Sequence, residues 1–335
     1  IAKTGSGKTA SFILPLLNTI LASPAAERNR QPKYLVLVPT RELAVQVTEV
    51  CKKLSRNLPQ SVKTMAVYGG VSINPQMKAL YGVDILIATP GRLLDLLRSK
   101  AVDLSKVETL VLDEADKMLN LGFEDEMQEI FELLPRKRQN MLFSATLSDQ
   151  LSGLNKVLLS DPVVIEIADK PDDIELINLA GYFVNDDRKG PLLRHLIKEQ
   201  DMEQVLVFTS SRHKADKVAG KLSRNGIEAA ALHSKKSQGA RTEALDKFKA
   251  GELQVLVATD LISRGIDINE LPYVINYELP RSPKDFAHRV GRTGRAKSEG
   301  LAITFVTRDE THHFKVILKK MKRYIDMVDS EEMNF

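Results

Sequence analysis

The sequence predicts an α/β protein of two tandem domains, in each of which helices flank a parallel sheet. Short, apolar, β-branched runs recur along the chain, and amphipathic segments with a helical period separate them. Near-continuous hydrophobic runs of this kind are typical of strands in a sheet that is buried on both faces. A length of 335 residues also favours two domains over one.

Strands and helices alternate in both halves of the chain. Strands are predicted over 34–38, 85–89, 109–113 and 141–145 in the first half, and over 205–208, 228–232, 255–259, 273–277 and 302–306 in the second. Amphipathic helices are predicted over 41–57, 123–134, 189–199, 211–225 and 238–250. Such alternation forms right-handed βαβ units.

A polar, acidic stretch with a proline interrupts this alternation at 168–175. It marks the boundary between the two predicted domains. We expect a first domain over 1–167, a linker over 168–178, a second domain over 179–325 and an acidic, non-periodic tail over 326–335.

Composition excludes several classes of protein. Hydrophobic residues make up 43% and charged residues 27%, which is typical of a globular chain and not of a disordered or fibrous one. No apolar run approaches the roughly 18 residues that span a bilayer, so no membrane partner is expected. Cys51 is the one cysteine, which excludes an internal disulfide and predicts a reducing, cytoplasmic environment. The net charge of +4 is compatible with nucleic acid.

A glycine-rich loop at the start of the chain fits the phosphate-loop pattern. Its backbone N–H groups are predicted to form an anion nest before a helix, where Lys8 holds the β- and γ-phosphates of a nucleotide and Thr9 binds Mg²⁺. The nest comprises Thr4, Gly5, Ser6, Gly7 and Lys8. The alternative is a plain glycine-rich turn.

Acidic and hydroxyl side chains follow two predicted strands of the first domain. Asp113 is a candidate Mg²⁺ ligand, and Glu114 is a candidate for orienting and deprotonating an attacking water. Ser144 and Thr146 are placed to hydrogen-bond this acidic cluster. The alternatives are an acidic helix N-terminus for the carboxylates and a helix cap for the hydroxyls.

The second domain has a charged loop at 288–295, with three arginines and two glycines. Arginine keeps its charge and forks onto phosphate oxygens, so this loop is a candidate source of an arginine finger. A solvated basic turn and a nucleic-acid patch are the alternatives.

Together these motifs resemble those of the DEAD-box RNA helicase family of superfamily two, over residue 2 to about 325. The residue sequences of 237–241 and 274–280 are most similar to those of the bacterial RhlE-type branch. The matching stretches are 2–9, 39–44, 69–70, 89–92, 113–116, 144–146, 207–210, Gln238 with Arg241, 258–260 with 264–267, and 288–295.

The resemblance implies two RecA-like domains, ATP and Mg²⁺ in the cleft between them, and RNA across both domains. It implies that Arg292 and Arg295 are the arginine fingers and that Asp267 contacts the ribose of ATP. It also implies that Asp116 and His288 couple the two domains.

The resemblance further implies contacts to the RNA backbone, with little sequence specificity. These contacts come from Pro39, Thr40, Arg41, Gly70, Thr89, Gly91 and Arg92 in the first domain, and from Thr209, Ser210, Gln238, Arg241, Thr259, Asp260 and Arg264 in the second. Structural alternatives are helix caps for Thr40 and Thr89 and a turn for Gly69–Gly70.

The resulting hypothesis is a monomeric RNA-dependent ATPase that unwinds or remodels short RNA duplexes or RNA–protein complexes, with partners in ribonucleoproteins or RNA decay. An ATP-gated RNA clamp and a DNA translocase of the same superfamily are the alternatives. Because the chain begins at Ile1, directly before the phosphate loop, we expect it to be incomplete at its N-terminus and to hydrolyse ATP weakly or not at all.

Three further features have structural interpretations. We expect Cys51 to be packed and His312–His313 to lie on the surface rather than in a metal site. The basic helix predicted at 315–323 is either a solvated face or an additional RNA contact.

Overall fold

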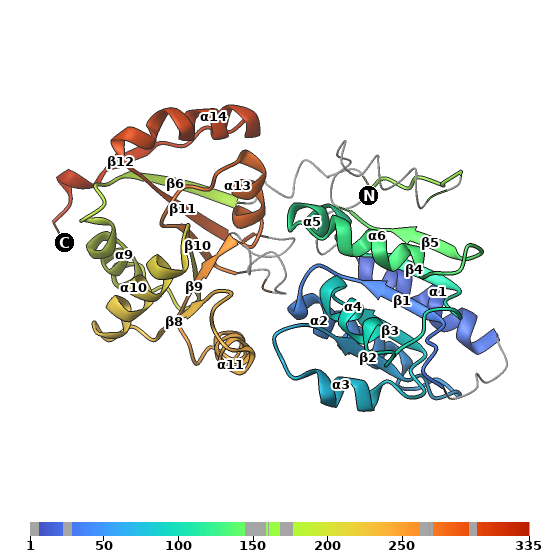
Figure 1. Cartoon of the computed structure of the whole chain (residues 1–335). Coiled ribbons are helices and arrows are strands. Elements are labelled where there is room, and N and C mark those ends of the chain that lie inside the picture. The colour runs from blue at the N-terminus through green and yellow to red at the C-terminus, as the bar shows by residue number, and fades with distance from the viewer. Residues whose placement is uncertain are drawn as a thin grey trace. The chain divides into compact units, whose positions relative to one another are not determined.

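The computed structural model describes residues 7–22, 29–144, 159, 161–167, 177–260, 268, 271–294 and 300–334. The chain divides into two compact units, Ile1–Asp169 and Lys170–Phe335 (Figure 1). Each unit contains one parallel sheet with helices packed against it, which confirms the predicted fold class.

The sheet of the first unit has the strand order β2-β3-β1-β4-β5, and every pairing in it is parallel. Its strands are β1 (Tyr34–Leu37), β2 (Thr64–Val67), β3 (Ile85–Ala88), β4 (Thr109–Leu112) and β5 (Gln139–Leu142). The helices of this unit are α1 (Lys8–Ala22), α2 (Arg41–Ser55), α3 (Ile73–Ala79), α4 (Pro90–Arg98), α5 (Ala115–Asn120) and α6 (Glu124–Glu132).

Alternate side chains of each central strand pack against different helices, because successive residues of a strand point to opposite faces. In β1, Tyr34 and Val36 belong to one core cluster with the apolar residues of α1 and α2. Leu35 and Leu37 belong to another, with those of α4, α5 and α6. Both faces are therefore buried, which explains why the strand sequences are continuously hydrophobic.

The sheet of the second unit has the order β12-β6-β11-β10-β7-β9-β8 and is also parallel throughout its described pairings. Its strands are β6 (Ile177–Phe183), β7 (Val205–Thr209), β8 (Ala229–Leu232), β9 (Val255–Thr259), β10 (Tyr273–Asn276), β11 (Gly300–Val306) and β12 (Met327–Asp329). The helices are α9 (Lys189–Glu199), α10 (Arg212–Ser223), α11 (Gln238–Lys249), α13 (Pro283–Val290) and α14 (Thr311–Met321), with short 3₁₀ turns at Arg308–Glu310 and Ser330–Glu332.

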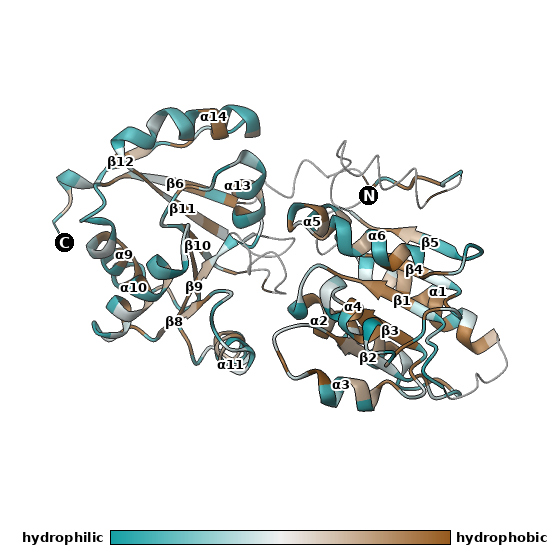
Figure 2. Cartoon of the chain, viewed as in Figure 1, coloured by the Kyte–Doolittle hydropathy of each residue, from teal (hydrophilic) through white to brown (hydrophobic). Residues whose placement is uncertain are grey.

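The helices of this unit also cover both faces of their sheet. Apolar residues of α9 and α10 form one cluster with Val205 and Val207 of β7. Those of α11, α13 and α14 form another with Leu206 and Phe208. Figure 2 shows the same division in both units, with hydrophobic colour along the central strands and both colours on the helices.

The structure corrects the interpretation of the C-terminal segment 326–335 as a non-periodic tail. Residues Met327–Asp329 form β12, which pairs with β6 at the edge of the sheet. Arg308 NH2 forms an ion pair with Asp329 Oδ2 of this strand at 2.6 Å. The strand is too short for its period to be visible in the sequence.

Two further strands, β2 at a sheet edge and β6 beside the edge strand β12, lie outside the predicted set. Strand β2 contains only four residues, and β6 includes Asn178 and Gly181 among its apolar residues. Strand β6 begins at Ile177, within the predicted linker range, and residues 168–176 lie outside the described part of the chain. No helix in the described ranges is both long and apolar enough to cross a membrane.

Candidate nucleotide and nucleic-acid sites

The predicted site residues of the first unit gather at the carboxyl edge of its sheet. Because all five strands are parallel, the segments that follow them emerge on the same side. Pro39–Arg41 follow β1, Gly69–Gly70 follow β2, Thr89–Arg92 follow β3, Asp113–Asp116 follow β4 and Ser144 follows β5.

The phosphate loop leads into the N-terminus of α1. Gly7 has a φ of +84°, a backbone conformation that favours glycine, and α1 begins at the next residue, Lys8. Thr9 lies in the first turn and is half-buried. This helix end offers N–H groups and a positive dipole to an anion. Thr4, Gly5 and Ser6 lie outside the described residues.

Asp113 is a buried carboxyl group at the end of β4. Its backbone N–H donates to Leu37 O at 3.0 Å, whereas its Oδ1 atom is buried without a hydrogen-bond partner. Burial, and then the charge of the neighbouring Glu114, raise the pKa of Asp113 from 3.8 to about 7, although Lys8 acts in the opposite direction. An orphaned carboxyl oxygen near Lys8 fits a site for a cation that accompanies a bound anion.

Glu114 is held in an unusual backbone conformation by the start of α5. Its φ of 55° and ψ of 45° lie in the left-handed region, which is uncommon for a residue other than glycine. Its Oε1 atom accepts from Lys117 Nζ at 2.6 Å, and both side chains are buried. Its Oε2 atom is buried without a hydrogen-bond partner. One carboxylate oxygen is thus fixed by an ion pair, whereas the other is buried and accepts no hydrogen bond.

The ends of β4 and β5 are tied together beside this carboxylate pair. Ala115 N–H donates to Phe143 O at 3.1 Å, and Phe143 N–H donates to Leu112 O at 2.8 Å. Asp116 and Ser144 are both buried at this junction. The structure therefore brings these two predicted coupling residues to the same edge, whereas Thr146 lies outside the described residues.

The predicted RNA contacts of the first unit form a cluster over β1, β3 and β2. Gly70 has a φ of +76°, and a Cβ atom there would collide with the guanidinium of Arg41. Arg92 is buried, donates to Val71 O at 2.8 Å and keeps its other terminal nitrogen without a hydrogen-bond partner. The Thr40 hydroxyl accepts from Leu43 N–H and caps α2, whereas Thr89 makes no such bond at the start of α4. Gly91 faces open space.

Gln76 in α3 holds the glycine pair in place. Its Oε1 atom accepts from Tyr68 N–H at 2.9 Å, and its Nε2 atom donates to Tyr68 O and Ser72 O at 3.3 and 3.2 Å. The side chain thereby spans the turn from Tyr68 to Ser72 from within. The sequence does not indicate Gln76, because a single glutamine in a seven-residue helix has no distinguishing pattern.

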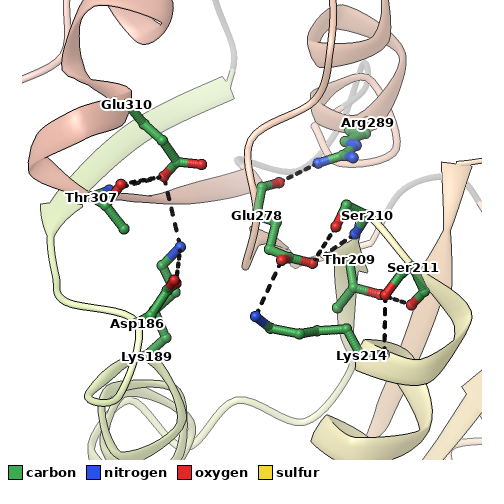
Figure 3. A network of polar contacts seen from close by, with 10 residues as sticks. All are labelled: Asp186, Lys189, Thr209, Ser210, Ser211, Lys214, Glu278, Arg289, Thr307 and Glu310. Atoms are coloured by element: carbon green, nitrogen blue, oxygen red, sulfur yellow. Dashed lines mark hydrogen bonds and ion pairs between the residues drawn. The ribbon is translucent and has the colours of Figure 1, made fainter.

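In the second unit, Ser210 and Glu278 meet at the carboxyl edge of neighbouring strands β7 and β10 (Figure 3). Glu278 Oε2 accepts from both the backbone N–H and the hydroxyl of Ser210, each at 2.8 Å. Lys214 Nζ lies 3.3 Å from the other carboxylate oxygen. Thr209 is fully buried and donates to Ser211 O at 3.3 Å. Of this predicted RNA-binding pair, only Ser210 is exposed, and Glu278 occupies its donors.

Arg289 and Asp260 form a two-pronged ion pair. The Nε and NH2 atoms of Arg289 donate to the two carboxylate oxygens of Asp260 at 2.6 and 2.7 Å. NH1 donates to Glu278 O at 2.7 Å and to Asn276 Oδ1 at 3.2 Å. Arg289 is almost fully buried, and its guanidinium lies 5.0 Å from the ring centre of Phe208. The Asp260 carboxylate, predicted to contact RNA, is therefore committed to an internal pair.

The other predicted residues of the second unit surround this network. Arg292 is buried just beyond α13, and its carbonyl accepts from Leu271 N–H at 3.0 Å. His288 and Thr259 are half-buried, whereas Arg241 is buried in α11 beside the half-buried Gln238. Arg264, Asp267 and Arg295 lie outside the described residues.

Each of the two units matches a different family model. Residues 1–154 match the DEAD/DEAH box helicase family, and residues 188–297 match the helicase conserved C-terminal domain. The chain is also 36% identical to a DEAD box protein from the hyperthermophile Methanococcus jannaschii, over 98% of this chain and 86% of that one, with a TM-score of 0.51.

The chain belongs to the DEAD-box helicase family.

Other family members resemble it over nearly its whole length. It is 39% identical to the Listeria monocytogenes ATP-dependent RNA helicase CshA, over 96% of this chain and 61% of that protein. Saccharomyces cerevisiae Dbp5, in a structure bound to RNA and ADP BeF3, matches with a TM-score of 0.82 and 29% identity over 99% of this chain and 85% of that one. The chain spans about three fifths of the length of the curated relatives it matches. The RhlE-type assignment stays a prediction.

Proposed function

We propose that this chain is an RNA-dependent ATPase that unwinds or remodels short RNA duplexes or RNA–protein complexes. The observation that carries this proposal is the Asp113–Glu114 pair, in which two buried carboxylates each keep an oxygen without a hydrogen-bond partner at the end of β4. The helicase name of the Listeria relative and the RNA in the Dbp5 structure support the same activity.

The start of α1 supplies the phosphate site in this proposal. Lys8 and the helix N-terminus bind the β- and γ-phosphates of ATP. Thr9 and Asp113 would hold Mg²⁺, which neutralises phosphate charge when bound. The described residues contain no cluster of three or more metal-ligating side chains. Mg²⁺ binds through one or two carboxylates together with the phosphates of its substrate.

Glu114 orients the attacking water in this proposal. Lys117 fixes one carboxylate oxygen at 2.6 Å, so Glu114 Oε2 accepts the hydrogen bond and takes the proton as the water attacks the γ-phosphate. Arg292 and Arg295 then supply the positive charge that stabilises the transition state, and Asp267 contacts the ribose. Asp116, Ser144, Thr146 and His288 relay nucleotide state between the two units.

RNA binds through its backbone in this proposal. The donor-rich loops at the carboxyl edges contact phosphates and sugars and read no bases, so little sequence specificity is expected. They comprise Pro39, Thr40, Arg41, Gly70, Thr89, Gly91 and Arg92, together with Ser210, Gln238, Arg241, Thr259 and Arg264. Asp260 and Thr209 are left out, because the first is paired with Arg289 and the second is fully buried.

RNA-stimulated ATP hydrolysis, measured on the full-length protein, tests the proposal. The Glu114→Gln variant should bind ATP and RNA as the wild type does but lose at least about 100-fold in kcat, because its amide cannot accept the proton. Glu108→Gln, at the opposite end of β4, is the matched control and should hydrolyse ATP normally. Unchanged hydrolysis by Glu114→Gln would refute the assignment of the base.

A duplex-displacement assay then separates the proposal from its alternatives. RNA duplexes should be separated in an ATP-dependent reaction. Binding without displacement would indicate an ATP-gated clamp, and stimulation by DNA in preference to RNA would indicate a DNA translocase.

A further inference from the structure

Three hydrogen-bond donors contact the same carboxylate at the carboxyl edge of the second sheet (Figure 3). They are the backbone N–H and the hydroxyl of Ser210 and the ammonium of Lys214. They stand at the start of α10, where the Ser211 hydroxyl accepts from Lys214 N–H as the helix cap. A main-chain N–H, a hydroxyl, a lysine and a helix N-terminus together form the donor set that binds a phosphate.

In this structure the carboxylate between these donors belongs to Glu278. Glu278, from the segment after β10, places Oε2 2.8 Å from both Ser210 donors and Oε1 3.3 Å from Lys214 Nζ. Burial alone raises the pKa of Glu278, but the bonds from Ser210 and the charge of Lys214 outweigh it and lower that pKa overall. The group is therefore an anion, as a phosphodiester is.

Glu278 is held at this point from behind by its own backbone. Its carbonyl accepts from Arg289 NH1 at 2.7 Å, and Arg289 is fixed in turn by its two bonds to Asp260. The Glu278 side chain remains partly exposed, with 17% of its surface accessible, and Ser210 is exposed. The main chain is therefore secured, whereas the carboxylate has a route to solvent.

We propose that Glu278 occupies an RNA-phosphate subsite formed by Ser210, Lys214 and the start of α10, and that RNA must displace its carboxylate in order to bind there. The inference rests on the proposed function and deepens it, because it names a residue that sets the affinity for RNA. In this displacement an RNA phosphate replaces the Glu278 carboxylate. The donors of Ser210 and Lys214 therefore have an anionic partner both before and after RNA binds.

The sheet offers a matched control for this carboxylate. Glu310 Oε2 accepts from the backbone N–H and the hydroxyl of Thr307, both at 3.0 Å, and lies 3.7 Å from Lys189 Nζ. It has the same kinds of partner at the end of β11, and its removal changes the net charge by the same amount. A general charge effect would therefore appear equally in Glu278→Gln and Glu310→Gln.

Binding of a fluorescent single-stranded oligouridylate, followed by anisotropy with the whole chain in ADP and beryllium fluoride, tests the inference. Glu278→Gln should bind about fivefold more tightly than the wild type, because a neutral amide competes less well for the donors. The slope of log affinity against log salt should steepen by up to about 0.7, because Lys214 is no longer neutralised in the free protein. Glu310→Gln should match the wild type in both measurements.

Glu278→Asp provides a second, more conservative variant in case Glu278→Gln folds poorly. It keeps the negative charge but withdraws the carboxylate by one methylene, so a smaller gain in affinity is expected. Unchanged or weaker binding by Glu278→Gln would overturn the inference and make Glu278 a support for the Ser210 loop. Equal gains in Glu278→Gln and Glu310→Gln would overturn it as a general charge effect. Failure of the wild type and all variants to bind RNA would instead refute the proposed function.

Discussion

Glu114 and Lys117 show how individual side chains at the end of β4 divide their roles. The ion pair between them is short and buried, and it leaves one oxygen of Glu114 without a hydrogen-bond partner. A buried pair of this kind contributes little to net stability, because desolvation offsets its attraction, but it fixes the direction of the carboxylate. Lys117 is therefore a positioning residue in the proposed reaction.

The Lys117→Met variant tests this role. We expect kcat for ATP to fall about tenfold with little change in KM, because a misdirected carboxylate no longer orients the water while the phosphate site remains intact. Lys52→Met, exposed on α2, is the control and should leave both constants unchanged. Steady-state ATP hydrolysis with saturating RNA measures them, and a change confined to KM would contradict the positioning role.

The sequence reveals the residues that carry motifs but not those that act through distant partners. Asp113 and Glu114 were recognisable because they adjoin each other at the end of an apolar run. Glu278 is 68 residues from Ser210, and Asp260 is 29 residues from Arg289, so only the sheet brings these pairs together. Cys51 was predicted to be packed, and the structure confirms it, since the side chain is fully buried in the core cluster of α1 and α2. This burial raises the pKa of the Cys51 thiol, against the smaller opposite effect of its hydrogen bond with Thr64.

Among the elements, α13 is joined to the sheet by polar contacts as well as by its apolar face. Arg289 links the helix to the end of β9 through Asp260 and to the end of β10 through Asn276 and the Glu278 carbonyl. In the sequence Arg289 is one of the three arginines of the charged loop, and composition cannot separate an arginine that contacts a ligand from one that fixes a helix.

The Arg289→Met variant should therefore lose stability. Its removal leaves the Asp260 carboxylate without its two-pronged partner, and we expect a loss of about 2–4 kcal/mol in the free energy of unfolding. Urea denaturation measures this loss. Arg281→Met, exposed in the segment before α13, should stay within about 0.5 kcal/mol of the wild type. Equal stability of Arg289→Met and wild type would contradict the proposed link.

The strands that are buried on both faces were predictable from the sequence, and so were the edge strands β5 and β8, whereas three other strands at or near a sheet edge were not. Strands such as β1 and β9 are buried on both faces, which makes their sequences continuously apolar. Strands β2, β6 and β12 lie at or near a sheet edge, where one side lacks a strand partner or the residues are only partly buried. Weaker burial demands less hydrophobicity, so their sequences do not stand out.

Across the whole molecule, each unit has its own pair of hydrophobic clusters. The clusters on the two faces of the first sheet draw all their members from Ile1–Asp169, and those of the second sheet draw theirs from Lys170–Phe335. Because burial of apolar surface is the main source of folding free energy, each unit has the means to fold on its own.

Scanning calorimetry of the whole chain should therefore record two unfolding transitions rather than one. The segment 170–335, prepared alone, should show a single transition within about 3 °C of one of these two, because its core is complete without the first unit. Arg289→Met shows which transition belongs to the second unit, because it should lower the temperature of that transition and leave the other unchanged. A single cooperative transition in the whole chain, shifted as one by Arg289→Met, would show instead that the two units stabilise each other strongly.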